Sequence, residues 1–151
     1  MLFRSCVSSC IGKYFESAQL PMHELTHLLR SKAVLMPGVS VTLYTEKTKE
    51  TQQWLYKGGL SDYLMQTLTA DPVIPLFEGT GFADKNADSF AEGEGAEWCV
   101  AFTEEGQPVR ESYVNLIPTS AGGTHESGLR DGLFNAVKNF VDQHSLLSKG
   151  V

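Results

Sequence analysis

Residues 109–144 read VRESYVNLIPTSAGGTHESGLRDGLFNAVKNFVDQH, which places an apolar strand, a glycine turn and a long helix next to one another. The residues at 109–117 favour a strand that Pro118 ends. After the turn, apolar side chains recur at steps of three and four, a spacing typical of a helix with one face on a core. This stripe consists of Leu129, Leu133, Ala136, Val137, Phe140, Val141 and His144.

Two details predict how this helix begins and packs. Thr124 is predicted to be the N-cap, because its hydroxyl can accept a hydrogen bond from a free backbone N–H group of the first turn. Gly128 and Gly132 lie one turn apart, and each costs about 1 kcal/mol of helix stability relative to alanine. We therefore expect another backbone to approach the helix closely at these two glycines.

The rest of the chain alternates between helical and strand patterns. Further helices are expected over 25–33 and 60–68, and strands over 39–44, 54–56 and 96–103. The first two strands predict a hairpin, and the third is expected to pair with 109–117. Residues 77–95 are predicted to be mainly a loop that flanks an irregular strand. These elements indicate an α/β or α+β class with helices on one face of a sheet.

The composition is that of an acidic globular domain. The chain has 151 residues, of which 42% are hydrophobic, and a net charge of −6. Its basic residues are scattered, which argues against a tight DNA-binding face. No apolar run approaches the roughly 20 residues that span a bilayer. Three cysteines without a disulfide-framework spacing, Cys6, Cys10 and Cys99, favour a reducing cytoplasm.

The first twelve residues differ from the rest. They read MLFRSCVSSCIG and show no periodicity that would pack on a core. They also lack the long apolar stretch and the cleavage site of a signal peptide. We therefore interpret residues 1–12 as foreign to the fold.

The string His23-Glu24-Leu25-Thr26-His27 matches H-E-x-x-H, the helix of zinc metallopeptidases. Two histidines four residues apart share a helix face and can bind zinc, while the glutamate can activate a bound water. A catalytic zinc needs a third protein ligand, and neither His125 nor His144 lies in a known third-ligand motif. A zinc metallopeptidase is therefore the weaker alternative, and the pattern also fits a solvated helix face.

The string Gly122-Gly123-Thr124-His125 raises a second hypothesis. Glycines before a helix N-terminus can hold phosphate, but the G-x-G-x-x-G and Walker spacings are absent. The residues therefore favour a structural turn from strand to helix. Since no nucleophile stands out beside a base, we predict no catalytic residue in these 151 residues. Because a third zinc ligand is missing, we also predict no metal ligand, and the phosphate-binding spacings that would indicate a cofactor-binding residue are absent.

Several separated blocks of sequence resemble the ATPase subunit of bacterial type IIA DNA topoisomerases. They are NLIPT at 115–119, GGTH at 122–125, GLRDGL at 128–133, LTHLLRSKAVLMPGV at 25–39 and YKGGLSDYL at 56–64. Within the family, KAVL at 32–35 followed by PGV at 37–39 is closer to the B subunit of topoisomerase IV than to that of gyrase. The blocks follow the family's order from about Lys13 to Val151, which makes them far more specific than H-E-x-x-H.

The resemblance implies a fold and a domain assignment. Residues 13–151 would be part of the transducer, a domain with a left-handed βαβ crossover and a mostly antiparallel or mixed sheet. Gly122, Gly123, Thr124 and His125 would form a structural signature turn of that domain. The family's ATP-binding domain precedes the matched region. Its transducer continues past the position of Val151, into a strand and a Gln-Thr-Lys loop whose lysine contacts the nucleotide. No ATP-contacting residue can therefore be placed on these 151 residues.

The resemblance also implies a function for the complete protein. In the family, ATP with Mg²⁺ dimerises two B subunits, and the transducer passes that state to the core that cleaves DNA and passes a second duplex through the break. The expected partners are a second B subunit, the enzyme's A subunit, and DNA, in the bacterial cytoplasm at the nucleoid, without a membrane. The isolated chain is not expected to be catalytic.

Overall fold

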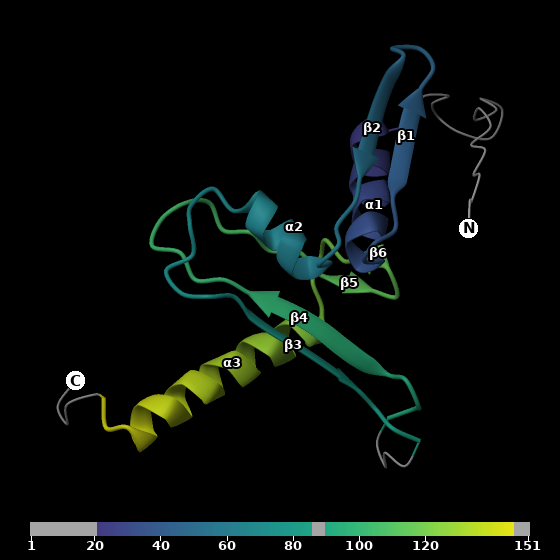
Figure 1. Cartoon of the computed structure of the whole chain (residues 1–151). Helices are drawn as coiled ribbons and strands as arrows, with labels where there is room; N and C mark the ends of the chain where they lie inside the picture. Colours follow the sequence, from purple (N-terminus) through teal and green to yellow (C-terminus); the bar gives the residue numbers. More distant parts are fainter. Residues whose placement is uncertain (1–20, 86–89, 147–151) are drawn as a thin grey trace. The chain divides into compact units, whose positions relative to one another are not determined.

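The computed structural model describes residues 21–85 and 90–146. The chain divides into two compact units, Met1–Val109 and Arg110–Val151, whose elements are labelled in Figure 1. Residues 1–12, which we expect to be foreign to the fold, lie outside the described residues. The expectation that residues 1–12 are foreign to the fold therefore stays a prediction.

The first unit begins with helix α1, Met22–Leu35. Proline has no N–H and a fixed φ, so it suits the position at which Pro21 precedes the helix. Met36 ends the helix immediately before Pro37. One face of α1 buries Ser31, Ala33 and Val34. The helix expected over 25–33 is thus confirmed and extends for several residues at its N-terminal end.

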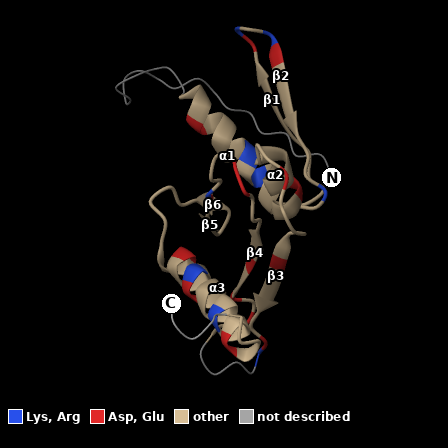
Figure 2. Ribbon diagram, turned by 90° about the vertical axis from the view of Figure 1, so that its left-hand side faces the viewer, with Lys and Arg blue, Asp and Glu red and all other residues tan. Residues whose placement is uncertain are grey.

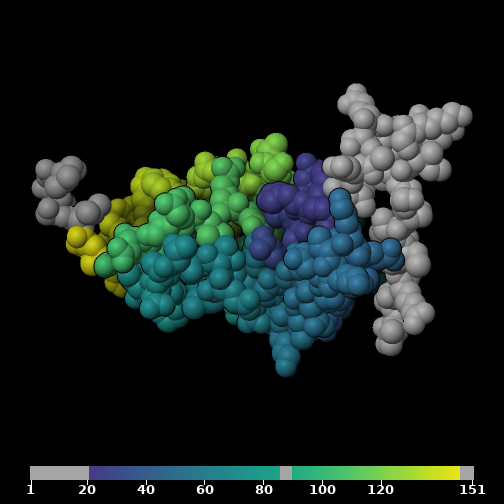
Figure 3. Space-filling view, turned by 90° about the horizontal axis from the view of Figure 1, so that it is seen from above, coloured from purple at the N-terminus to yellow at the C-terminus, as the bar shows by residue number. Residues whose placement is uncertain are grey.

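Strands β1, Val41–Thr45, and β2, Glu50–Trp54, form the expected antiparallel hairpin. Exposure alternates along β1, as the period of a half-buried strand requires. Helix α1 packs along this hairpin, as the adjoining purple and blue segments of Figures 1 and 3 show. The first strand begins at Val41 rather than at residue 39, and Tyr56 lies beyond the second strand.

Helix α2, Leu60–Thr67, completes the small core of the first unit. The buried residues of this core are Ala33, Val34, Tyr56 and Tyr63. The Tyr56 and Tyr63 rings meet edge to face with their centroids 5.5 Å apart, which is a favourable aromatic geometry. Gly59 precedes α2 with φ +61°, and a Cβ there would lie 3.0 Å from Pro37 Cγ. The glycine therefore permits both the turn and the close approach of the proline.

Strands β3, Phe77–Phe82, and β4, Gly95–Val100, form a second antiparallel hairpin. The prediction that 77–95 is mainly loop is wrong for its first six residues, and so is the pairing of 96–103 with 109–117. Gly79 and Gly81 weaken the strand pattern in the sequence, because glycine is disfavoured in strands. Across the hairpin, however, Gly79 faces Trp98, whose ring occupies the space of the missing side chain.

The second unit contains two very short strands and one long helix. Strands β5, Tyr113–Val114, and β6, Ile117–Pro118, pair with each other around the turn Asn115-Leu116. Both turn residues have positive φ, 48° and 67°, as a two-residue hairpin turn of type I′ requires. The long strand predicted over 109–117 is therefore wrong, because the chain reverses in its middle. A leucine in this conformation is rare, so the sequence gives little warning of the turn.

Helix α3, Thr124–Gln143, confirms the long C-terminal helix. Two details of the prediction are wrong. The N-cap is Gly123 and Thr124 is the first helical residue, with no side-chain capping bond. A Cβ built on Gly128 or Gly132 meets no atom within 4 Å, so no backbone approaches these glycines closely. None of the residues of α3, all of which the structure describes, is buried.

These elements confirm the mixed α/β (α+β) class with antiparallel pairing. Within the described residues the strands form three separate two-stranded sheets, and the left-handed βαβ crossover stays a prediction. Figure 2 shows acidic and basic positions interleaved along α3, in line with the scattered basic residues of the sequence. Among the residues that the structure describes, none of the helices has the length and apolar character needed to span a membrane.

Candidate functional site

The H-E-x-x-H residues lie together on α1, but they do not form a metal centre with other described residues. His23 and Glu24 are exposed, and His27 is half-buried. Within 21–85 and 90–146, the structure has no group of three His, Cys, Asp or Glu side chains that could hold a metal ion. A peptidase zinc needs three protein ligands, so the metallopeptidase hypothesis gains no support.

The signature turn at 122–125 connects β6 to α3. The Gly122 N–H donates to the Thr119 carbonyl at 2.9 Å, and Gly122 has φ +75°, where glycine avoids the strain of a side chain. Gly123 is the N-cap, and its carbonyl accepts from the N–H groups of Glu126 and Ser127 at 3.2 and 3.3 Å. The turn residues thus begin the helix through backbone bonds.

A polar cluster at the start of α3, which the sequence reasoning missed, joins three segments of the second unit. We name it the Glu126 clasp and define it as Arg110, Ser112, Thr119 and Glu126. The Glu126 Oε2 atom accepts from Arg110 Nε at 2.6 Å and lies 2.5 Å from Arg110 Nη2. Its Oε1 atom accepts from the Ser112 hydroxyl. The clasp thereby ties the start of the unit to the first turn of α3.

Thr119 completes the clasp on the hairpin side. The Ser112 and Thr119 hydroxyls lie 2.5 Å apart, and the Thr119 N–H donates to the Ser112 carbonyl at 2.8 Å. The Glu126 side chain is 15% exposed, whereas Arg110 is 66% exposed. The carboxylate therefore occupies a partly desolvated position at which all three segments converge.

The electrostatics of the clasp favour the ionised form of Glu126. The hydrogen bond from Ser112, followed by that from Arg110, holds the pKa of this carboxyl below its ordinary value, and the nearby His125 acts in the same direction. A carboxylate in the first turn also interacts favourably with the helix dipole. Glu126 is the third residue after the N-cap Gly123, where glutamate commonly caps a helix. The three-residue spacing from the N-cap is the signal in the sequence that could have identified Glu126, provided that the helix start is assigned to Gly123.

The geometry offers no catalytic arrangement around the turn. His125 Nε2 lies 3.4 Å from Thr119 Oγ1, which is long for a nucleophile and its base. The Ser112 hydroxyl is already engaged by Thr119 and Glu126. What the cluster can do chemically is hold the segment before β5, the segment after β6 and the first turn of α3 in one arrangement.

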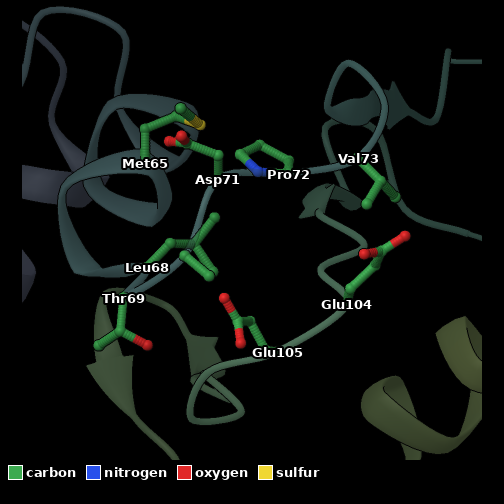
Figure 4. Close-up of a pocket in the computed structure, with 9 residues that line it drawn as sticks. Met65, Leu68, Thr69, Asp71, Pro72, Val73, Glu104 and Glu105 are labelled. Atoms are coloured by element: carbon green, nitrogen blue, oxygen red, sulfur yellow. The ribbon is translucent and has the colours of Figure 1, made fainter.

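An open pocket of about 450 Å³ lies in the first unit, after α2. Figure 4 shows three carboxylates around it, from Asp71, Glu104 and Glu105, with Leu68 and Val73 among its apolar residues. No basic side chain lines it. Because carboxylates repel the phosphates of a nucleotide, this pocket is unsuited to ATP.

Three comparisons with known proteins place the chain among its relatives. The family model for DNA gyrase B matches residues 59–151. The chain is 39% identical over 140 residues to the B subunit of DNA topoisomerase 4 from Escherichia coli, and the match covers 91% of this chain and 21% of that protein. It is 41% identical over 147 residues to the corresponding protein of Haemophilus influenzae, with 92% and 21% covered. The DNA gyrase B subunit of Haloferax lucentense is 31% identical over 138 residues, with 88% and 20% covered.

A solved structure also matches. It is described as the topoisomerase IV ATP-binding domain of Francisella tularensis in complex with a small-molecule inhibitor, with a TM-score of 0.63 and 31% sequence identity. The match covers 93% of this chain and 36% of the solved chain. The chain spans about a fifth of the length of the curated relatives.

Proposed function

This chain belongs to the DNA gyrase B family, and we propose that it forms the transducer part of the B subunit of a type IIA DNA topoisomerase. The observation that carries the proposal is the match to the B subunits of topoisomerase 4, about 40% identical across nine-tenths of the chain. The identity to the gyrase B subunit of Haloferax lucentense is 31%. The residues KAVL at 32–35 favour the topoisomerase IV branch.

In this proposal residues 13–151 couple ATP-driven dimerisation of two B subunits to DNA cleavage and strand passage. ATP and Mg²⁺ bind elsewhere in the complete protein, because these 151 residues lack a phosphate-binding spacing and their described pocket is acidic. The partners are a second B subunit, the enzyme's A subunit, and DNA, and the enzyme works in the bacterial cytoplasm at the nucleoid. The turn at Gly122, Gly123, Thr124 and His125 has a structural role.

A chimera tests the proposal. The segment of the Escherichia coli topoisomerase 4 B subunit that aligns with this chain is replaced by residues 13–151, and the product is mixed with the A subunit of that enzyme. We expect ATP-dependent decatenation of linked DNA circles, because a family transducer should carry the signal between the same neighbours. The matched control carries a short glycine-serine linker in place of the segment and should be inactive. A folded chimera that hydrolyses ATP and binds the A subunit, yet never decatenates DNA, would refute the proposal.

A further inference from the structure

Within the second unit, helix α3 is not held by a hydrophobic core. None of its residues from Thr124 to Gln143 is buried, and large apolar side chains such as Phe134, Val137 and Phe140 are more than half exposed. Strands β5 and β6 have two residues each, too few to offer the helix an apolar face. Packing that normally fixes a helix against its neighbours is therefore absent from the described part of this unit.

Polar contacts of the first turn take the place of that packing. Glu126 reaches back 16 residues to Arg110 and 14 residues to Ser112. Ser112 in turn contacts Thr119 at the end of the hairpin. Charge-assisted hydrogen bonds of this kind are stronger and more directional than neutral ones. One carboxylate thus links the first turn of the 20-residue helix α3 to the segment that precedes the hairpin.

The link between β6 and α3 contains two consecutive glycines. Gly122 and Gly123 are consecutive and have φ values of +75° and 173°. Glycine has a wide range of accessible backbone conformations, and hinge movements are absorbed at a few such positions between elements.

We propose that Gly122-Gly123 is a hinge and that the Glu126 clasp locks it. While Glu126 contacts Arg110 and Ser112, α3 has one fixed direction relative to the β5–β6 hairpin. When these contacts break, α3 samples a range of directions. The hinge is a property of this chain alone. Its use in passing movement along a topoisomerase B subunit rests on the proposed function. Arg110 is the first residue of the second unit. A force transmitted along the preceding chain would therefore act directly on the contact between Arg110 and Glu126.

Distances between spin labels on the 151-residue chain test the hinge. The labels are attached at Val114→Cys on the hairpin and Lys138→Cys on α3, after Cys6 and Cys10 are replaced by serine and Cys99 by alanine. We expect a narrow distance distribution in the otherwise unchanged chain. Glu126→Ala should broaden it, and the charge exchange Arg110→Glu with Glu126→Arg should narrow it again. Rescue by reversed charges is an effect that simple loss of helix stability would not produce.

Asp131→Ala is the matched control, because Asp131 is an exposed acidic residue on the same helix and lies outside the clasp. It should leave the distribution as narrow as before. Amide exchange at Gly122 and Thr119 should rise about tenfold in Glu126→Ala, as expected for the loss of charged hydrogen bonds, with exchange in the middle of α3 unchanged. Circular dichroism checks that α3 stays helical, and Glu126→Gln replaces Glu126→Ala if it does not.

Two results would overturn the hinge. One is a distribution that stays narrow when Glu126 is neutralised in a chain with intact helices. The other is a distance distribution in the unchanged chain that is already as broad as the distribution in Glu126→Ala. Both are independent of enzyme activity, so a failure of the hinge is distinguishable from a failure of the chimera to decatenate DNA.

Discussion

At the residue scale, single atoms at the start of α3 decide how the second unit is held. Glu126 is the clearest case, because one carboxylate accepts hydrogen bonds from Arg110 and Ser112, which lie 16 and 14 residues before it. Gly122 is the complementary case, because it contributes by lacking a side chain in the space beside Arg110 and Glu126. Both residues lie in or beside the signature turn, so the turn and the clasp form one structural unit.

Replacing Gly122 by alanine should destabilise the chain. A Cβ there would lie 2.9 Å from Arg110 Nη2 and 3.2 Å from Glu126 Oε1, and φ is +75°. We expect a loss of about 1–2 kcal/mol in urea unfolding, the cost of a left-handed conformation for a residue with a side chain. Gly128→Ala is the control, since it meets no atom within 4 Å and should stabilise the helix by up to about 1 kcal/mol. Equal effects of the two changes would contradict this account.

Glu126 should also make the stability depend on pH. Its pKa in the folded chain is lowered by the Ser112 hydroxyl and Arg110, with His125 acting in the same direction. Between the ordinary pKa of glutamate and the lowered pKa of Glu126 in the folded chain, the unfolded chain binds more protons than the folded chain. The stabilisation that ionised Glu126 gives the fold is therefore complete above the ordinary pKa, and it is lost as the pH falls through the lowered pKa. The urea midpoint of the unchanged chain should approach that of Glu126→Gln as the pH falls below the ordinary pKa of a glutamate carboxyl. A constant difference between the two midpoints across this range would exclude the effect.

At the element scale, the hairpins show how pairing depends on what lies across the strand. β3 contains two glycines in six residues, and its register places Gly79 opposite Trp98. A large aromatic side chain thereby covers a glycine that would otherwise weaken the strand. The hairpin β5–β6 depends instead on two consecutive residues with positive φ.

Gly79→Ala should disturb the β3–β4 hairpin, because a Cβ at Gly79 would lie 2.6 Å from ring atoms of Trp98. We expect a loss of about 1–3 kcal/mol, as for other overpacked sites, with a red shift of Trp98 fluorescence as the ring moves into solvent. Trp54→Phe removes the second tryptophan signal. The matched change is Gly81→Ala in the same strand, which meets no atom within 4 Å and should leave the emission in place. An unmoved spectrum in Gly79→Ala would show that the ring tolerates the methyl group.

At the scale of the whole molecule, the chain is a set of small elements with a limited core. Among the described residues of the first unit, only four hydrophobic side chains are buried, those of Ala33, Val34, Tyr56 and Tyr63. In the second unit the apolar stripe of α3 is exposed, with Phe140 at 56%. In the proposed transducer role, the chain would act by transmitting movement between its neighbours.

The 151-residue chain should not hydrolyse ATP by itself. It has no phosphate-binding spacing, and the pocket after α2 is lined by the carboxylates of Asp71, Glu104 and Glu105. Phosphate release measured with excess ATP and Mg²⁺ should equal the background of buffer alone. The complete chimeric protein is the positive control. ATP hydrolysis that stays with the chain through a second purification column would overturn the assignment of residues 13–151 to the transducer.

The sequence by itself was enough for the family, for α1, α2 and α3, and for the β1–β2 hairpin. Helical periodicity, proline and glycine punctuation and blocks of family residues are local signals, so each can be read without knowing what packs against it. A local signal of this kind is not sufficient to predict a zinc site from H-E-x-x-H. The motif places two ligands and a base on one helix turn, whereas the third ligand must come from another part of the chain.

Only the tertiary structure decided the partner of β4, the reversal at Asn115-Leu116 and the clasp around Glu126. The β3–β4 pair depends on a glycine facing Trp98, and the sequence does not show which residues lie opposite one another. Leu116 adopts a conformation that leucine rarely occupies, so its residue type points away from the turn. Glu126 meets Arg110 and Ser112 across 16 and 14 residues, and contacts over such separations exist only after the chain has folded back on itself.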